Sequence, residues 1–277
     1  MTDPHAIIAQ TVRRFDPDRY FSALFAPETV RRHLMTLYAF NHETARIAET
    51  VHQPMMGQIR LEWWRETLDG ARNGAPRDHN VARALAELFA AQALPIELFD
   101  AILDARAFDT SQEMFFDWAA VETYCDATSG NIMRLASRIL WSDGEGDAAA
   151  REAGIAYALA GLIRALPFHA ARHKVYLPQD VLDAAGLSPD TIMAGAFNVK
   201  VKAAVAQTLQ KAREHFLKAQ HVRIPRALLP GFLPAALVPL YLRRAGSKSF
   251  DPLKHSGDVP QYRKQIALFA AAARGRI

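Results

Sequence analysis

The sequence predicts an all-α protein, and three observations lead to that fold class. Apolar residues recur at three- and four-residue intervals in one segment after another, which places them on one face of a helix. No convincing run of alternating apolar and polar residues between hairpin turns is present. Half of the 277 residues are hydrophobic, and no linker-like run interrupts them. Residues 1–277 are therefore expected to form one domain.

The N-terminal half contains five expected helices, with boundaries set by the apolar spacing: residues 6–12, 27–51, 56–71, 81–93 and 96–110. Pro27 suits the first turn of its helix, because proline lacks the N–H that this position leaves unpaired. A loop rich in Asn, Gly and Pro over residues 72–78 separates the third helix from the fourth.

The C-terminal half contains five more: residues 121–140, 148–166, 199–219, 229–243 and 261–274. The most apolar stretch, residues 227–242, includes three prolines, which predict a kinked helix. It is shorter than the ~20 apolar residues of a membrane-spanning helix, so we expect it to be buried.

Small residues form one stripe along the helix expected over residues 148–166: Gly154, Ala158, Gly161 and Ala165. Such a stripe lets another helix backbone or a ligand chain come unusually close. The sequence leaves both interpretations open.

Charge and cysteine content limit the classes of partner and compartment. Lys and Arg number 33 against 29 Asp and Glu, an excess that we interpret as spread along the chain and that indicates no nucleic-acid partner. Basic pairs such as Arg243-Arg244 suit an anionic membrane surface or a solvated helix face, so peripheral membrane contact stays open. The single Cys125 excludes an internal disulfide, and the N-terminus lacks the apolar core of a secretory signal. A cytoplasmic location is expected, with inner-membrane contact left open.

One helical segment carries a distinctive motif, Leu37-Tyr-Ala-Phe-Asn-His-Glu-Thr-Ala-Arg-Ile-Ala-Glu49. Its Ala45 and Glu49 lie one turn apart, with Arg46 beside them. The segment resembles the first acidic motif of the squalene/phytoene synthase family, in which Tyr-Ala-Phe precedes two aspartates and a third acidic residue. On that pattern Ala45 and Arg46 occupy the aspartate positions and Glu49 the third.

A second segment, Gly161-Leu-Ile-Arg-Ala-Leu-Pro-Phe-His-Ala-Ala-Arg-His-Lys-Val-Tyr-Leu-Pro178, is similar to the family's second motif without its acids. Residues 61–68 resemble the family's Trp-Arg segment, and residues 124–130, beginning at Tyr124, resemble its Tyr and Gly segment. The resemblance covers roughly residues 20–245.

The resemblance implies an isoprenoid-synthase-type antiparallel helix bundle around a central apolar cavity. The family ionises a prenyl diphosphate with several Mg²⁺ ions, which need oxygen ligands. Because Glu49 is the one acid left at the matching positions, we expect no catalytic residue, no metal site and no cofactor. What remains is a degenerate diphosphate or lipid pocket formed by Arg46, Glu49, Tyr124, Gly161, Arg164, Ala165 and His169.

Phe40-Asn41 and residues 166–178 look most like the family's non-catalytic branch, which includes the mitochondrial complex I assembly factor. This predicts a pseudoenzyme that binds a partner protein, or an isoprenoid or quinone-like lipid, in assembling a respiratory complex. The alternative is an active Mg²⁺-dependent head-to-head prenyltransferase, with acids recruited from Glu43, Asp180 or Asp183. A third reading is a scaffold whose cavity is filled by its own side chains.

Overall fold

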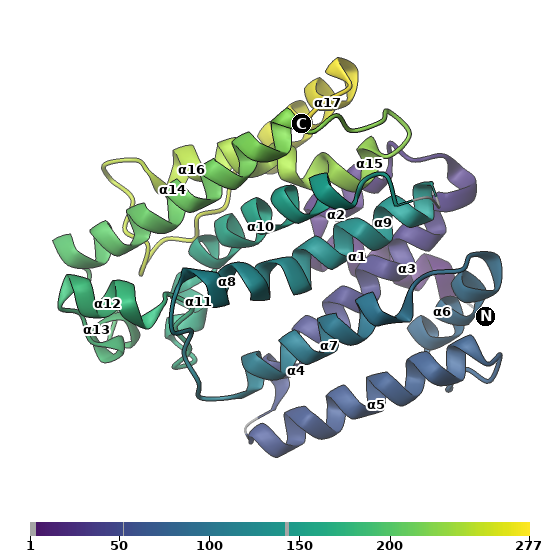
Figure 1. The fold of residues 1–277 in the computed structure, drawn as a ribbon, viewed down its shortest axis with the longest axis horizontal. Coiled ribbons are helices and arrows are strands. Elements are labelled where there is room, and N and C mark those ends of the chain that lie inside the picture. The colour runs from purple at the N-terminus through teal and green to yellow at the C-terminus, as the bar shows by residue number, and fades with distance from the viewer. Residues whose placement is uncertain (1–3, 52, 142–143) are drawn as a thin grey trace.

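The computed structural model describes residues 4–51, 53–141 and 144–277, and every regular element in these ranges is helical (Figure 1). The first part of the chain forms α1 (Pro4–Phe15), α2 (Pro17–Ala23), α3 (Glu28–Ala45), α4 (Ile47–Thr50), α5 (Pro54–Arg72), α6 (Asn80–Ala91) and α7 (Ile96–Thr110). It continues into α8 (Trp118–Cys125), the π-helical turn η1 (Asp126–Gly130) and α9 (Asn131–Leu140). The all-α prediction is confirmed.

The rest of the chain forms α10 (Asp147–Arg164), α11 (Leu166–Ala170), α12 (Gln179–Ala185), α13 (Pro189–Met193) and α14 (Val199–His221). The proline-containing apolar stretch becomes α15 (Leu229–Phe232), the 3-10 turn η2 (Leu233–Leu237) and α16 (Val238–Ala245), followed by α17 (Gln261–Arg274). This stretch is kinked and largely buried, as predicted. Among the described residues, no helix is long and apolar enough to cross a membrane.

Two expected helices end earlier than the periodicity indicated. The helix expected over residues 27–51 stops at Ala45, and α4 begins at Ile47, so Arg46 lies between two helices. The helix expected over residues 148–166 stops at Arg164. Pro167 explains the second break, because it has no N–H to donate to the preceding turn of α10 and its ring crowds the carbonyl there.

Helix α10 runs through the middle of the bundle and packs against α9, η1, α14, α16 and η2 (Figure 1). On one side, the fully buried Phe40 of α3 meets Trp64 of α5 and Phe99 of α7 edge to face. On the other, α10 shares a core with Phe232 and Tyr241 from the proline-rich elements. Helix α9, which supplies residues to both cores, joins the two sides, and α10 packs against it.

The two glycines in the small-residue stripe of α10 lie in different surroundings. A Cβ placed on Gly154 would lie 2.4 Å from the Cα of Gly130 in η1, so helix and turn meet backbone to backbone. A Cβ placed on Gly161 would meet no atom within 4 Å. Close packing therefore explains the glycine at position 154 but not the glycine at position 161.

Candidate functional site

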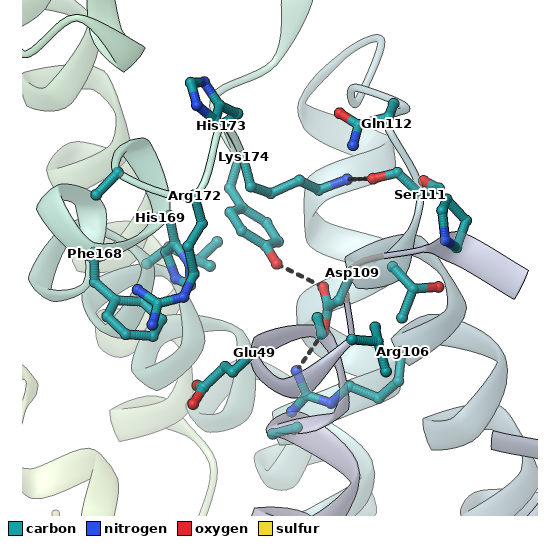
Figure 2. Close-up of a pocket in the computed structure, with 18 of the residues that line it drawn as sticks. Glu49, Arg106, Asp109, Ser111, Gln112, Phe168, His169, Arg172, His173 and Lys174 are labelled. Carbon is teal, nitrogen blue, oxygen red and sulfur yellow. Dashed lines mark hydrogen bonds and ion pairs between the residues drawn. The ribbon is translucent and has the colours of Figure 1, made fainter. Parts of the chain in front are cut away.

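A pocket of about 810 Å³ lies between α4, the C-terminal end of α7, and the segment that follows α11 (Figure 2). Polar and charged side chains dominate its lining, among them Glu49, Arg106, Asp109, Tyr124, His169 and Lys174. Figure 2 shows the Glu49 side chain between the α11 side, with Phe168 and His169, and the Asp109–Arg106 pair.

Asp109 is the most heavily bonded group of the pocket, and its side chain is only 5% exposed. One carboxylate oxygen accepts hydrogen bonds from the hydroxyls of Tyr124 at 2.8 Å and Tyr176 at 2.7 Å. The other accepts from the Arg106 guanidinium at 3.0 Å. These hydrogen bonds involve both carboxylate oxygens, so Asp109 binds groups of the protein itself.

Electrostatics fix the protonation of the three donors around Asp109. Burial raises the pKa of both tyrosine hydroxyls far above the usual value, and the nearby Asp109 carboxylate raises it further. Burial would lower the pKa of Arg106, but the oxygens of Tyr124 and Asp109 outweigh it, and the pKa is raised. Both tyrosine hydroxyls therefore stay protonated and the Arg106 guanidinium stays charged near pH 7.

Lys174 fixes the loop on the other side of the pocket. Its ammonium donates to the backbone carbonyls of Phe108, Ser111 and Glu113 at 2.8–2.9 Å, and burial lowers the pKa of Lys174 to about 8. Two of these carbonyls lie at the C-terminal end of α7, where carbonyls lack helical partners. Lys174 thus closes the end of α7 and is not free to hold a ligand.

The remaining basic groups at the pocket come from the α11 segment. The Arg172 guanidinium lies 3.6 Å from the centre of the Phe168 ring, and both it and His173 are exposed. His169 lies 4.7 Å from the Tyr176 ring, and burial lowers the pKa of His169 to about 4, so its imidazole is neutral near pH 7. Arg172 is therefore the cation of this segment that can meet a ligand.

Three of the seven residues expected to form the pocket line it: Glu49, Tyr124 and His169. Arg46 points elsewhere, with its guanidinium 3.8 Å from Glu43, and lines a smaller pocket of about 330 Å³ beside Trp63 and Trp64.

Arg164 also lies outside the pocket, with its guanidinium 3.0 Å from the buried Asp18 carboxylate and 4.5 Å from the Tyr241 ring centre. Gly161 lines none of the pockets described in this section, and Ala165 borders a separate one of about 470 Å³. The structure does not bring Arg46 and Arg164 together into a phosphate clamp.

A small apolar space adjoins the pocket. It has a volume of about 10 Å³ and is bordered by Leu159, Leu162, Ile163 and Tyr176. This apolar space shares Leu162 and Tyr176 with the lining of the polar pocket, so the two adjoin.

Sequence reasoning missed Arg106, Asp109 and Lys174 as pocket residues. Arg106 and Asp109 are one helical turn apart, which alone indicates an ordinary surface ion pair. Their importance comes from the tyrosines of two other segments, and no local pattern reports that contact.

The all-helical bundle has the fold of isoprenoid synthases. One solved structure of this class, a dehydrosqualene synthase in complex with ligand, superposes with a TM-score of 0.84 at 15% identity, over 98% of this chain and 96% of that one. Residues 12–265 match the squalene/phytoene synthase family, and the chain belongs to it.

Two relatives illustrate the range of proteins that this chain resembles. The NADH dehydrogenase (ubiquinone) complex I assembly factor 6 of Rattus norvegicus is 26% identical over 252 residues, which are 90% of this chain and 76% of that protein. The 15-cis-phytoene synthase of Synechococcus elongatus is 23% identical over 284 residues, 97% of this chain and 92% of that protein. Assembly factors and synthases are both relatives of this chain.

Proposed function

We propose that this protein is a non-catalytic member of its family that takes part in assembling a respiratory complex at a membrane, and that its pocket binds the polar end of an apolar lipid or isoprenoid. The observation that carries the proposal is the chemistry of the side chains that line the pocket, which suits a polar head group and does not suit several Mg²⁺ ions. Similarity to the complex I assembly factors supports the assembly role.

The residues present do not fit the several Mg²⁺ ions on which the family's synthases depend. Mg²⁺ needs octahedral oxygen ligands that are free to bind it. Glu49 supplies one carboxylate, whereas both oxygens of Asp109 accept hydrogen bonds from the protein. Among the described residues, no group of three or more His, Cys, Asp or Glu side chains could hold a metal ion.

The acids that a shifted alignment would recruit do not repair this set. Glu43 borders the smaller pocket beside Arg46. Asp180 and Asp183 lie on α12, and neither lines the 810 Å³ pocket. No ionisation step can be assigned to these residues, so the pocket is proposed to bind a ligand without transforming it.

The pocket retains the means to bind an anionic or polar head group. Arg172 is exposed at its wall, and a guanidinium can hold a phosphate or carboxylate through two hydrogen bonds. A site that holds substrate and product equally well adds affinity without rate.

The alternative is an active Mg²⁺-dependent prenyltransferase, and the shared fold and the phytoene synthase relative favour it. Diphosphate release from farnesyl and geranylgeranyl diphosphates, with Mg²⁺ or with a chelator, separates the two. We expect no release under conditions in which an intact synthase of the family turns over. Release that depends on Mg²⁺ would overturn the non-catalytic assignment.

The assembly role is tested by deleting the gene in its own organism and measuring assembled complex I and NADH oxidation in membranes. We expect both to fall, and both to be restored by the wild-type chain and by Glu49→Gln, which removes the only carboxylate at the matched family positions. Normal complex I in the deletion strain would contradict the assembly role. Failure of Glu49→Gln alone, with the protein folded and present, together with Mg²⁺-dependent diphosphate release by the wild type, would contradict a non-catalytic pocket.

A further inference from the structure

The positive charge of this chain is concentrated at its C-terminal end, which corrects the interpretation of an evenly spread excess. Residues 223–277 contain ten Lys and Arg against two Asp, a net charge of +8, whereas the whole chain carries +4. Residues 1–222 are therefore net acidic, at −4. The basic excess therefore belongs to the part of the chain that forms the proline-rich elements and α17.

Helix α17 lies at the edge of the bundle, near the top of Figure 1, and has two unlike faces. Lys264, Leu268 and Ala271 are buried against the body of the protein, mainly against η2. The opposite face carries large apolar side chains exposed to solvent, Tyr262 at 58%, Ile266 at 65% and Phe269 at 69%. Their spacing of four and three residues places them in one row.

Arginines lie beside that row. A groove of about 1090 Å³ between α16 and α17 is lined by Arg243, Arg244, Arg263 and Arg274, together with Ile266. The carboxylate that lines it, Asp258, is 2.6 Å from the Lys264 ammonium and so is already paired. An apolar row with arginines beside it is the pattern of helices that lie in a membrane interface.

We propose that this surface, the exposed face of α17 and the arginines of the adjoining groove, docks the protein on an anionic lipid membrane. The apolar row enters the interfacial layer, while the arginines contact lipid phosphates and keep their charged ends in water. Tyr262 suits that layer, because its ring is apolar and its hydroxyl remains hydrated.

Size and charge both favour a membrane over a protein partner. The row extends only ~10 Å along the helix, and three side chains fall short of the roughly 800 Å² that each partner contributes to a stable protein interface. A membrane needs only shallow insertion, because many lipid charges act on the arginines at once. Each basic side chain near an anionic surface strengthens binding by roughly fivefold.

The inference deepens the membrane contact in the proposed function and does not depend on the pocket being inactive. The test is flotation of the purified full-length chain with two kinds of vesicle, phosphatidylcholine alone and phosphatidylcholine with about a third phosphatidylglycerol. We expect at least roughly tenfold stronger binding to the anionic vesicles, falling steeply as salt rises from about 0.15 M to about 1 M.

Two double variants locate the contact, Ile266→Ser with Phe269→Ser, and Arg243→Glu with Arg263→Glu. Each should weaken binding to anionic vesicles at least roughly tenfold while the circular dichroism spectrum is unchanged. The matched controls lie on α5, on the opposite side of the bundle in Figure 1: Ile59→Ser, where the side chain is 54% exposed, and Arg72→Glu.

Both control variants should bind like the wild type. Equal binding to both vesicles, no binding to either, or equal losses in the α5 controls would overturn the proposal. Because vesicle binding is measured without the respiratory complex, its failure would leave the assembly test untouched, and the reverse also holds.

Discussion

At the scale of single residues, the most constrained group is Asp18, which sequence reasoning did not single out. Its side chain is 2% exposed and accepts hydrogen bonds or ion pairs from Tyr157, Tyr241, Arg164 and Lys264. Burial would raise the pKa of Asp18, but Arg164, Lys264 and Tyr241 outweigh it and the pKa is lowered. This carboxylate joins α2 to α10, α16 and α17.

Replacing Asp18 by Asn should destabilise the protein by roughly 3 kcal/mol or more, because it leaves the Lys264 ammonium, itself 3% exposed, with reduced compensation. Urea unfolding at neutral pH measures this. The control is Asp104→Asn, which removes an exposed partner of Arg65 and should cost about 1 kcal/mol or less. Equal losses in the two variants would contradict the role assigned to Asp18.

The same carboxylate predicts how stability changes in acid. Since the folded pKa of Asp18 lies below its unfolded value of 3.8, its contribution is complete above pH 3.8 and is lost as the pH falls through the folded pKa. The Asp18→Asn variant should therefore depend less on pH below about 4 than the wild type does. Parallel profiles for the two proteins would rule this out.

His169 predicts a second pH effect, over a higher range. Burial first, and then the nearby Arg172, lowers the pKa of His169 from 6.5 to about 4, so the unfolded chain binds more protons between these values. Folding stability should fall by up to roughly 3 kcal/mol as the pH drops from 6.5 to 4. In His169→Gln this part of the profile should disappear, and an NMR titration of the wild-type ring should give its pKa directly.

At the scale of elements, the contact between α10 and η1 depends on two glycines. Gly154→Ala should destabilise the protein by about 1–3 kcal/mol, because the new methyl group would overlap the backbone of Gly130 and force the two elements apart. Gly161→Ala, in the same helix, meets no atom within 4 Å.

Gly161→Ala should stabilise the protein by roughly 0.5–1 kcal/mol, since alanine loses less backbone entropy on folding into a helix than glycine does. Thermal unfolding of both variants tests the pair. If both variants lost stability equally, Gly161 would have a contact that the structure does not contain.

At the scale of the whole molecule, the prediction of a single domain has its own test. All four tryptophans lie within residues 1–141, so their fluorescence reports on that part, whereas far-ultraviolet circular dichroism reports on helices throughout. Because α10 packs against elements of both parts and Asp18 ties α2 to α17, the two signals should give one unfolding midpoint in urea. Two separated midpoints would indicate two domains.

Much of the fold follows from local sequence, since the regular spacing of apolar residues in a long helix is visible in any stretch of two or three turns. The short helices α2, α12 and α13 were missed because five to seven residues show no periodicity. Pro167 signals a helix end, and the apolar spacing around it led the expected helix too far. The position of Arg46 between α3 and α4 has no comparable signal.

The sequence by itself determined the helical class and the family, because each depends on residue types and their spacing along the chain. Only the tertiary structure decided that Asp109 is occupied by two tyrosines and Arg106, that Arg164 serves Asp18, and that α17 has an exposed apolar face. Those facts depend on contacts between segments far apart in the chain. The pattern of a single helix records that a face is apolar, but the packing of the whole bundle determines what covers it.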